Sequence, residues 1–165
     1  MFATDADLLH RIAAALLRRR ECFGTAESCT GGLIAAACTD LSGSSQLFER
    51  GVVTYSNEAK TELLGVPAAL IAQHGAVSAE VAGHMARGLL SRAPVDWALS
   101  VTGIAGPTGG SPAKPVGTVW LALAQRGGPV QVWRELFSGD RAAVRAQTLA
   151  SGLTALLKAL QASNP

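Results

Sequence analysis

The sequence predicts an α/β domain with a mixed, mostly parallel central sheet, for two reasons. First, stretches with helical periodicity alternate along the chain with short stretches rich in β-branched and aromatic residues, which is the pattern of strands connected by helices. Second, two alternating stretches, 117–125 and 130–137, are separated only by residues 126–129. This connection is too short for a crossover helix, so these two strands must form an antiparallel hairpin within the sheet.

The first predicted element is an amphipathic helix over about residues 4–20. The basic run at its end, residues 18–20, complements the negative end of the helix dipole, and we expect a solvated terminus there. His10 is expected on the solvated face. The apolar positions recur at helical spacing and are Leu8, Leu9, Ile12, Leu16 and Leu17.

An apolar segment follows and ends at Glu27, and the apolar run 33–38 then predicts a buried helix. Ser28 stands at the junction between them as a candidate nucleophile. A helix start leaves backbone N–H groups free, and Gly31 and Gly32 would let a ligand approach them closely. This loop therefore predicts a site that binds an anion or stabilises an oxyanion. An equally open alternative is that Ser28 only caps the helix.

Four further elements are predicted in the middle of the chain. Stretches 48–55 and 95–102 have the composition of strands, and the second has the continuous apolar character of a strand covered on both faces. Stretches 57–64 and 78–90 have helical periodicity, and Ser78 supplies a cap for the second. Strands interleaved with helices in this way indicate crossover connections.

The C-terminal part of the chain predicts a long loop and a final helix. Residues 103–115 are rich in glycine and proline and cannot form a regular element. Because this loop directly follows a central strand, it lies at the carboxyl edge where open α/β sheets bind ligands. The final helix is expected from Asp140 to about residue 162.

Tyr55 and Lys60 are the second set of candidate site residues. They stand about one helical turn apart, at a strand end and in the helix that follows, so both can face one pocket. A lysine side chain has a pKa of about 10.4, but burial disfavours its charged form and can bring a free amine within reach of neutral pH. Such an amine can take a proton from Ser28. The alternative is a solvated lysine on a helix surface.

Two neighbours of Ser28 have alternative interpretations. Glu27 is either an ion-pair partner for Lys60 or a polar residue at a strand end, and we include it among the residues expected to contact substrate. Cys29 is an alternative nucleophile. We rank it behind Ser28 because no histidine is close in sequence and small buried cysteines are common.

The glycine-rich loop after the strand 95–102 predicts a phosphate-binding nest, because repeated glycines let successive N–H groups converge on an anion. No Gly-Lys-Ser/Thr follows, so the loop is not a Walker loop. The alternative is a tight excursion between strands. The residues expected to contact substrate here, together with Thr30 beside Ser28, are Thr102, Gly103, Ile104, Ala105 and Gly106.

Arginines at the start of the final helix are candidates for an anionic group of the substrate. Arg141 and Arg145 open this helix, where a guanidinium can reach a phosphate or a carboxylate, and we expect an arginine such as Arg145 to make that contact. Local charge pairing with Asp140 is an equally open alternative.

Composition argues against several function classes. The formal net charge is +2 and aromatic residues make up 5% of the chain, which disfavours nucleic acid as the main partner. No stretch is long enough to span a membrane, and Asp5 and Asp7 precede the first apolar part, unlike a secretion signal. The cysteines at 22, 29 and 38 suit neither a zinc knuckle nor paired disulfides, which indicates a reducing compartment. We therefore expect a cytoplasmic protein.

The length and the histidines complete these expectations. A chain of 165 residues with 48% hydrophobic content suits one domain, 1–165. His10, His74 and His84 make no metal-ligand spacing, so we expect neither a metal nor a cofactor. His74 is expected in a turn before Val77.

Several ordered motifs resemble the CinA C-terminal domain family, whose name refers to competence- and damage-inducible proteins. The likeness covers nearly the whole chain after the first helix, and the combination is far more specific than any single motif. The motifs are Ala26–Gly32, Gly51–Lys60, Leu64–Pro67, Val77–Glu80, Thr102–Pro107, Lys114–Val119 and Phe137–Arg141.

The resemblance implies a fold, an activity and a site. The fold is a three-layer α/β/α sandwich. Members similar to this chain are stand-alone nicotinamide-nucleotide amidases, which hydrolyse the carboxamide of nicotinamide mononucleotide in pyridine-nucleotide recycling. The family's serine nucleophile matches Ser28, and the assisting lysine and tyrosine match Lys60 and Tyr55. The expected partner is therefore a small-molecule substrate, and a homodimer is the favoured assembly.

The expected mechanism is a serine acyl-enzyme route. Neutral Lys60 removes the Ser28 proton, N–H groups around Thr30 to Gly32 hold the oxyanion, and Tyr55 positions the lysine or relays a proton. The competing class is a pyridine-nucleotide-binding module without turnover. The retained serine, lysine and tyrosine favour the enzyme, because binding alone does not need them.

Overall fold

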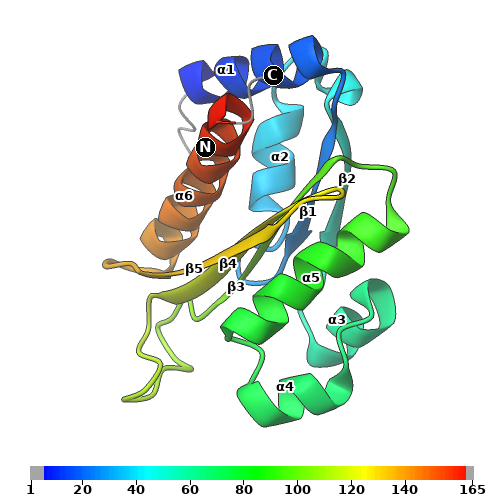
Figure 1. Cartoon of the computed structure of the whole chain (residues 1–165). Helices are drawn as coiled ribbons and strands as arrows, with labels where there is room; N and C mark the ends of the chain where they lie inside the picture. The colour runs from blue at the N-terminus through cyan, green and yellow to red at the C-terminus, as the bar shows by residue number, and fades with distance from the viewer. Residues whose placement is uncertain (1–5, 163–165) are drawn as a thin grey trace.

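The computed structural model describes residues 6–162, in which helices and strands alternate as expected (Figure 1). In chain order the elements are α1 (Ala6–Arg19), β1 (Phe23–Glu27), α2 (Leu33–Thr39), the short 3-10 turn η1 (Ser44–Gln46), β2 (Phe48–Val53), α3 (Asn57–Leu64), α4 (Ala68–His74), α5 (Ala79–Arg92), β3 (Trp97–Gly103), β4 (Thr118–Gln125), β5 (Val130–Leu136) and α6 (Arg141–Ala162).

Five strands of the described chain form one sheet in the order β2-β1-β3-β4-β5. β1 runs parallel to both β2 and β3, whereas β4 pairs antiparallel with β3 and β5. Within this sheet β4 is therefore the one strand that runs opposite to the others. The predicted mixed, mostly parallel sheet with an antiparallel hairpin is confirmed.

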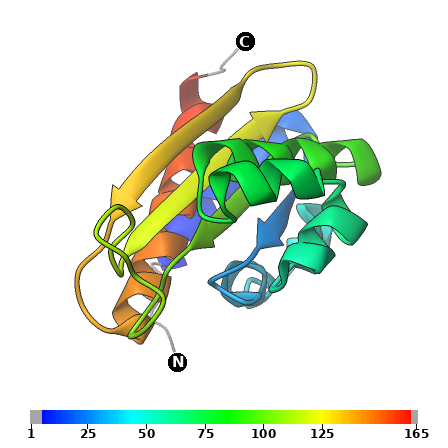
Figure 2. The same ribbon diagram turned by 90° about the horizontal axis from the view of Figure 1, so that it is seen from below.

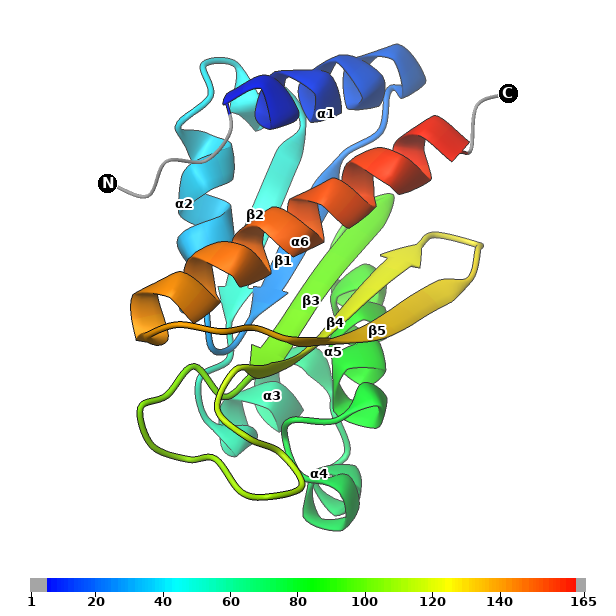
Figure 3. The ribbon, with the colours of Figure 1, turned by 90° about the vertical axis from the view of Figure 1, so that its left-hand side faces the viewer.

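Helices cover both faces of the sheet, which makes three layers. α1, α2 and α6 lie on one face, as Figure 3 shows from that side, and α3, α4 and α5 lie on the other. The view from below in Figure 2 places the sheet between α5 and α6. The side chains of β3 alternate accordingly. Leu99 and Val101 enter the core with α1, α2 and α6, whereas Ala98 enters the core with α5.

The α5 face of the sheet carries small side chains, which lets α5 approach closely. Ala98 and Ala122 are fully buried beneath it, and the buried Ser100 hydroxyl donates to the Ala82 carbonyl at 2.7 Å. Gly88 extends this close packing to α3, because a Cβ added there would lie 1.9 Å from the Leu64 carbonyl oxygen. The side-chain volumes thus fix how near α5 lies to the sheet and to α3.

Most sequence predictions of elements are confirmed, and α3 has the predicted limits. The predicted start of the first helix near residue 4, with Asp5, lies outside the described residues. Leu17 was wrongly placed on the buried face and is 51% exposed. The buried face of α1 instead includes Ala13 and Ala15, because small residues fill the side that packs closest.

α4 was missed, and His74 is its last residue rather than part of a turn. The helix is only seven residues long, too short to establish a periodicity, and Gly75 ends it with a positive φ of 77°.

The strand topology determines where a site can form. β1, β2 and β3 are parallel, so the segments that follow Glu27, Val53 and Gly103 leave the sheet at the same edge. The predicted irregular stretch after β3 is confirmed, since no helix or strand is present between Gly103 and Thr118. No helix within residues 6–162 combines the length and apolar character that crossing a bilayer requires.

A pair of glycine substitutions in α5 tests the packing of this layer. Gly88→Ala is expected to destabilise the protein by about 3 kcal/mol, because the new methyl group would overlap the backbone of α3. Gly83→Ala is the matched control, since its Cβ would first meet the flexible Arg87 side chain at 3.3 Å. It should be neutral or stabilising by up to about 1 kcal/mol through helix propensity. Urea unfolding of both variants measures this, and equal midpoints would contradict the packing argument.

Candidate active site

A cavity of about 210 Å³ opens at the carboxyl edge of the parallel strands, where the loops after β1, β2 and β3 meet. It combines a hydroxyl, a buried amine, a phenol and a guanidinium in one place. Its lining residues are Ser28, Cys29, Tyr55, Asn57, Lys60, Ala76, Val77, Thr102, Gly103, Ala105 and Arg141.

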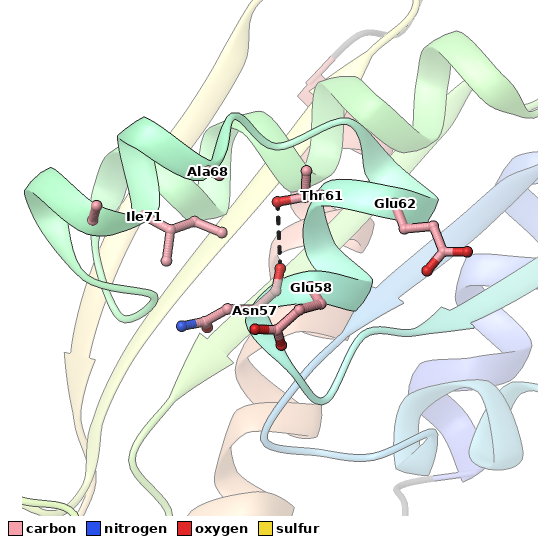
Figure 4. Close-up of a pocket in the computed structure, with 7 residues that line it drawn as sticks. Asn57, Glu58, Thr61, Glu62, Ala68 and Ile71 are labelled. Carbon is pink, nitrogen blue, oxygen red and sulfur yellow. Dashed lines mark hydrogen bonds between the residues drawn. The ribbon is translucent and has the colours of Figure 1, made fainter.

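A second, larger cavity of about 550 Å³ lies between α3 and α4 (Figure 4). Figure 4 shows Glu58 and Glu62 at its wall and Ile71 opposite them. Neither Ser28 nor Lys60 lines it. The smaller cavity therefore holds the chemically informative groups.

The Lys60 side chain is almost completely buried, with 1% of the residue's surface exposed. Its Nζ lies 3.1 Å from Ser28 Oγ, 2.9 Å from the Thr54 carbonyl oxygen and 3.4 Å from the Ser56 carbonyl oxygen. The start of α3 holds the side chain in this position, because Ser56 caps the helix by accepting from the Ala59 N–H. The lysine and the serine, remote in sequence, therefore meet in one cavity.

The surroundings of Lys60 favour the neutral amine. Burial lowers the pKa of Lys60 below its ordinary value of 10.5, and the charges of Cys29 and Glu58 oppose this only in part. No carboxylate among the described residues forms an ion pair with it. The charged amine donates to Ser28 Oγ and to both carbonyls, whereas a neutral amine would keep two N–H donors for the carbonyls and have a lone pair to accept from the Ser28 hydroxyl.

Of the two sequence interpretations of Glu27, the polar residue at a strand end is confirmed, because Glu27 is the last residue of β1. It is 1% exposed, makes no ion pair with Lys60 and is not among the residues that line the cavity. Its carboxylate lies beneath the loop that follows β1. Five donors surround it: Thr25 Oγ1 at 3.0 Å, Thr30 Oγ1 at 2.7 Å, and the N–H groups of Gly32, Ile34 and Ala35 at 3.0, 3.1 and 2.8 Å.

The loop 28–32 also differs in detail from the expectation. α2 begins after Gly32, which has no side-chain cap, so Ser28 is not the cap of this helix. The N–H of Gly31 donates to the Ser28 carbonyl oxygen at 3.0 Å, and that of Gly32 donates to Glu27. Neither is free for a ligand, which corrects the predicted anion site at these two glycines.

Thr30 faces away from the cavity. Its hydroxyl donates to Glu27, its carbonyl accepts from Arg145 Nη2 at 2.8 Å, and its side chain is fully buried. The side chain therefore cannot contact a ligand as predicted. The N–H groups of Cys29 and Thr30 make no hydrogen bond to another residue within 6–162.

Cys29 lines the cavity but is chemically inert at neutral pH. Burial is the main cause that raises the pKa of its thiol, to about 11. Since the thiolate is the reactive form, a group that ionises only at this pH is a poor nucleophile under physiological conditions. The three cysteines, Cys22, Cys29 and Cys38, are all free thiols.

Tyr55 lines the cavity with Lys60, as predicted, but it is 63% exposed. Its hydroxyl accepts from Arg141 Nη2 at 2.8 Å, so Lys60 is positioned by backbone carbonyls rather than by this phenol. Arg141 Nη1 donates to the Gly106 carbonyl oxygen at 3.0 Å. The guanidinium thus spans from the loop after β3 to the loop after β2.

Arg141, not Arg145, is the arginine of α6 at the cavity. Arg145 lies one turn further along the helix and holds Thr30 instead, which corrects its predicted contact with substrate. The alternative of charge pairing with Asp140 is also wrong, because Asp140 Oδ1 accepts from the Ala143 N–H and caps the helix.

The loop after β3 contributes part of the predicted nest. Thr102, Gly103 and Ala105 line the cavity, whereas Ile104 and Gly106 do not. The N–H of Ile104 donates to the Thr118 carbonyl and its carbonyl accepts from the Gly117 N–H, so this residue serves the backbone. The Thr102 hydroxyl is likewise occupied, since it donates to the Ala76 carbonyl oxygen at 2.9 Å.

The histidines lie away from the cavity. His10 is exposed, and His74 lies 3.4 Å from Glu80 near the end of α4. Within the part of the chain that is described, histidine, cysteine and acidic side chains form no group of three that could hold a metal ion.

Comparisons with known proteins identify the family of this chain and agree with its fold. Residues 5–160 match the family model described as the CinA C-terminal domain. The nicotinamide-nucleotide amidohydrolase PncC of Escherichia coli strain K12 is 53% identical over 156 residues, which cover 93% of this chain and 94% of that protein. A CinA-like protein of Citrifermentans bemidjiense is 56% identical over 154 residues, which cover 93% of this chain but 37% of that protein.

A solved structure extends the comparison to three dimensions. The competence/damage inducible protein CihA from Agrobacterium tumefaciens superimposes with a TM-score of 0.93 at 43% sequence identity. The match covers 98% of each chain. Both the architecture and the sequence are thus similar over nearly the whole length.

Proposed function

The chain belongs to the CinA C-terminal domain family, and from this we propose that it hydrolyses the carboxamide of nicotinamide mononucleotide to nicotinic acid mononucleotide and ammonia. It is an amidohydrolase by its similarity to proteins with that name. The observation that carries the proposal is the buried Lys60 amine 3.1 Å from the Ser28 hydroxyl. We also propose that the protein acts in the cytoplasm as a homodimer. Its reaction would serve the recycling of pyridine nucleotides.

The first half of the reaction forms an acyl-enzyme. Ser28 Oγ bonds to the carboxamide carbon while its proton passes to the neutral Lys60 amine. The oxygen of the amide becomes negative and is held by the N–H groups of Cys29 and Thr30, which make no hydrogen bond to another residue of the described chain. When the carbon–nitrogen bond breaks, the Lys60 ammonium returns the proton to the leaving nitrogen and ammonia departs.

The second half releases the acid. Water attacks the ester carbon, Lys60 takes a proton from the water, and the bond to Ser28 Oγ breaks as that proton returns to the serine. The sum of both halves is one amide and one water giving one acid and one ammonia. No step requires a metal ion or a redox group.

Arg141 gives the site a group that can recognise the substrate's phosphate. Its side chain lines the cavity, and both of its recorded hydrogen bonds go to neutral acceptors, Tyr55 Oη and the Gly106 carbonyl. A phosphate dianion is a stronger partner for a guanidinium than either of these. We therefore assign Arg141, in place of Arg145, to the phosphate.

The serine is tested by ammonia release from nicotinamide mononucleotide. Wild-type protein is expected to release ammonia, and Ser28→Ala should lower kcat at least about 10³-fold because the attacking oxygen is lost. Ser42→Ala, at an exposed position of the same residue type, is the control and should keep wild-type activity. A fully active Ser28→Ala protein would remove this residue as nucleophile. Wild-type protein that binds the nucleotide without hydrolysing it at any pH would instead be the binding module.

The phosphate assignment is tested by comparing two substrates. Arg141→Gln should raise the KM for nicotinamide mononucleotide about 10- to 100-fold, the range expected for losing a hydrogen bond between charged groups. The KM for nicotinamide riboside, which lacks the phosphate, should change less than about threefold. Arg134→Gln, an exposed arginine on β5, is the matched control. Equal losses on both substrates would contradict a phosphate contact.

A further inference from the structure

We propose that Glu27 is a positioning residue of the reaction: its carboxylate holds the loop 28–32 so that the N–H groups of Cys29 and Thr30 remain for the oxyanion. This inference rests on the proposed amide hydrolysis. Glu27 itself touches neither the cavity nor Lys60, so it acts only through the loop that it holds.

The carboxylate connects three parts of the chain at a single buried point. Oε1 accepts from Thr25 on β1 and from the Ala35 N–H on α2, and Oε2 accepts from the Thr30 hydroxyl and the N–H groups of Gly32 and Ile34. The loop that carries Ser28 is thereby fixed at both of its ends. An ionised carboxylate suits this place because it accepts at both oxygens and donates at neither.

Most backbone N–H groups of the segment 28–35 are already engaged in hydrogen bonds. The N–H of Ser28 donates to the Val101 carbonyl at 3.0 Å, and that of Gly31 donates to the Ser28 carbonyl. Glu27 takes the N–H of Gly32 and the next amides of α2. Among residues 28–35 the N–H groups of Cys29 and Thr30 therefore make no hydrogen bond to another residue of the described chain, and that of Cys29 contacts only its own thiol.

Two adjacent N–H groups without a hydrogen bond to any other described residue are unusual in so buried a place. Cys29 is 6% exposed and Thr30 is fully buried, and nearly all buried backbone N–H groups in proteins are hydrogen-bonded. They follow Ser28 directly, and Cys29 lines the cavity beside its hydroxyl. Consecutive N–H groups next to a nucleophile are the arrangement that stabilises a developing oxyanion.

Thr30 is the link through which Glu27 acts on these amides. Its hydroxyl is held by Glu27, on β1 of the sheet, at 2.7 Å, and its carbonyl by Arg145 Nη2, on α6, at 2.8 Å. Because residue 30 is held at both its side chain and its backbone, the preceding peptide groups have little freedom to rotate. Loss of the Glu27 contact should therefore displace the N–H groups of Cys29 and Thr30 without preventing the substrate from binding.

Two threonines provide a matched test. Thr30→Val and Thr25→Val are the same nearly isosteric change, both sites are fully buried, and each removes one hydroxyl donor from the Glu27 carboxylate. Only Thr30 belongs to the loop that carries Ser28. A structural role alone predicts the same effect for both variants, whereas positioning predicts different effects on the reaction. Glu27→Gln is the third variant, because its amide group would present N–H donors to groups that themselves donate.

The first readout is steady-state hydrolysis of nicotinamide mononucleotide, with the melting temperature of each variant measured alongside. Thr30→Val and Glu27→Gln should lower kcat about 10- to 100-fold with KM changed less than about threefold, since the lost interaction matters in the transition state. Thr25→Val should keep kcat within about twofold. Equal losses of kcat in the two threonine variants, or a loss that appears in KM alone, would overturn the inference.

The second readout does not depend on the substrate assignment. Phenylmethanesulfonyl fluoride should modify Ser28: Oγ bonds to sulfur, fluoride leaves and the hydroxyl proton passes to Lys60. The rate, followed by intact mass, should fall in Thr30→Val and Glu27→Gln but not in Thr25→Val. If wild-type protein is labelled with this ranking yet releases no ammonia, the proposed substrate fails and the inference stands. If all variants label at the wild-type rate, or wild-type Ser28 neither labels nor turns over, the inference fails.

Discussion

The contact between the Lys60 amine and the Ser28 hydroxyl is the interaction on which the rest of this site depends. The two groups come from different crossover connections, and they meet because β1 and β2 are parallel neighbours whose carboxyl ends share one edge. Burial of a lysine is costly while it is charged, and the cost falls when the amine is neutral. Burial of Lys60 therefore lowers its pKa, and the proposed role of its amine as a base depends on this.

The two faces of the sheet contribute differently to this contact. The α5 face has small side chains, which brings α5 and α3 close and fixes the helix that carries Lys60. On the other face, Arg145 on α6 holds the carbonyl of Thr30 in the loop that carries Ser28. The buried Glu27 joins that loop to β1 and α2. Packing on each face therefore helps to position one of the two groups that meet in the cavity, the Lys60 amine or the Ser28 hydroxyl.

Local sequence signals were enough to locate most elements and to single out Ser28 and Lys60, which the structure brings together, but not the partners that hold them. Ser28 and Lys60 stand where a strand ends and a helix begins, which periodicity and cap residues indicate. The five donors to Glu27 come from residues up to 35, and no local pattern shows that a carboxylate would collect them. Arg141 and Arg145 are one turn apart on α6. Which of the two lies at the cavity depends on how the helix packs against the loops, and the sequence does not show this.

Direct titration of the Lys60 amine tests the central claim most closely. The chain has three lysines, Lys60, Lys114 and Lys158, so the side-chain NMR signals of isotope-labelled lysine can be assigned by single substitutions. The account predicts that Lys60 titrates below its ordinary pKa of 10.5, and that Ser28→Ala alters this titration because the amine loses its hydroxyl partner. A Lys60 pKa at or above 10.5, unaffected by Ser28→Ala, would contradict the claim that this amine is the base.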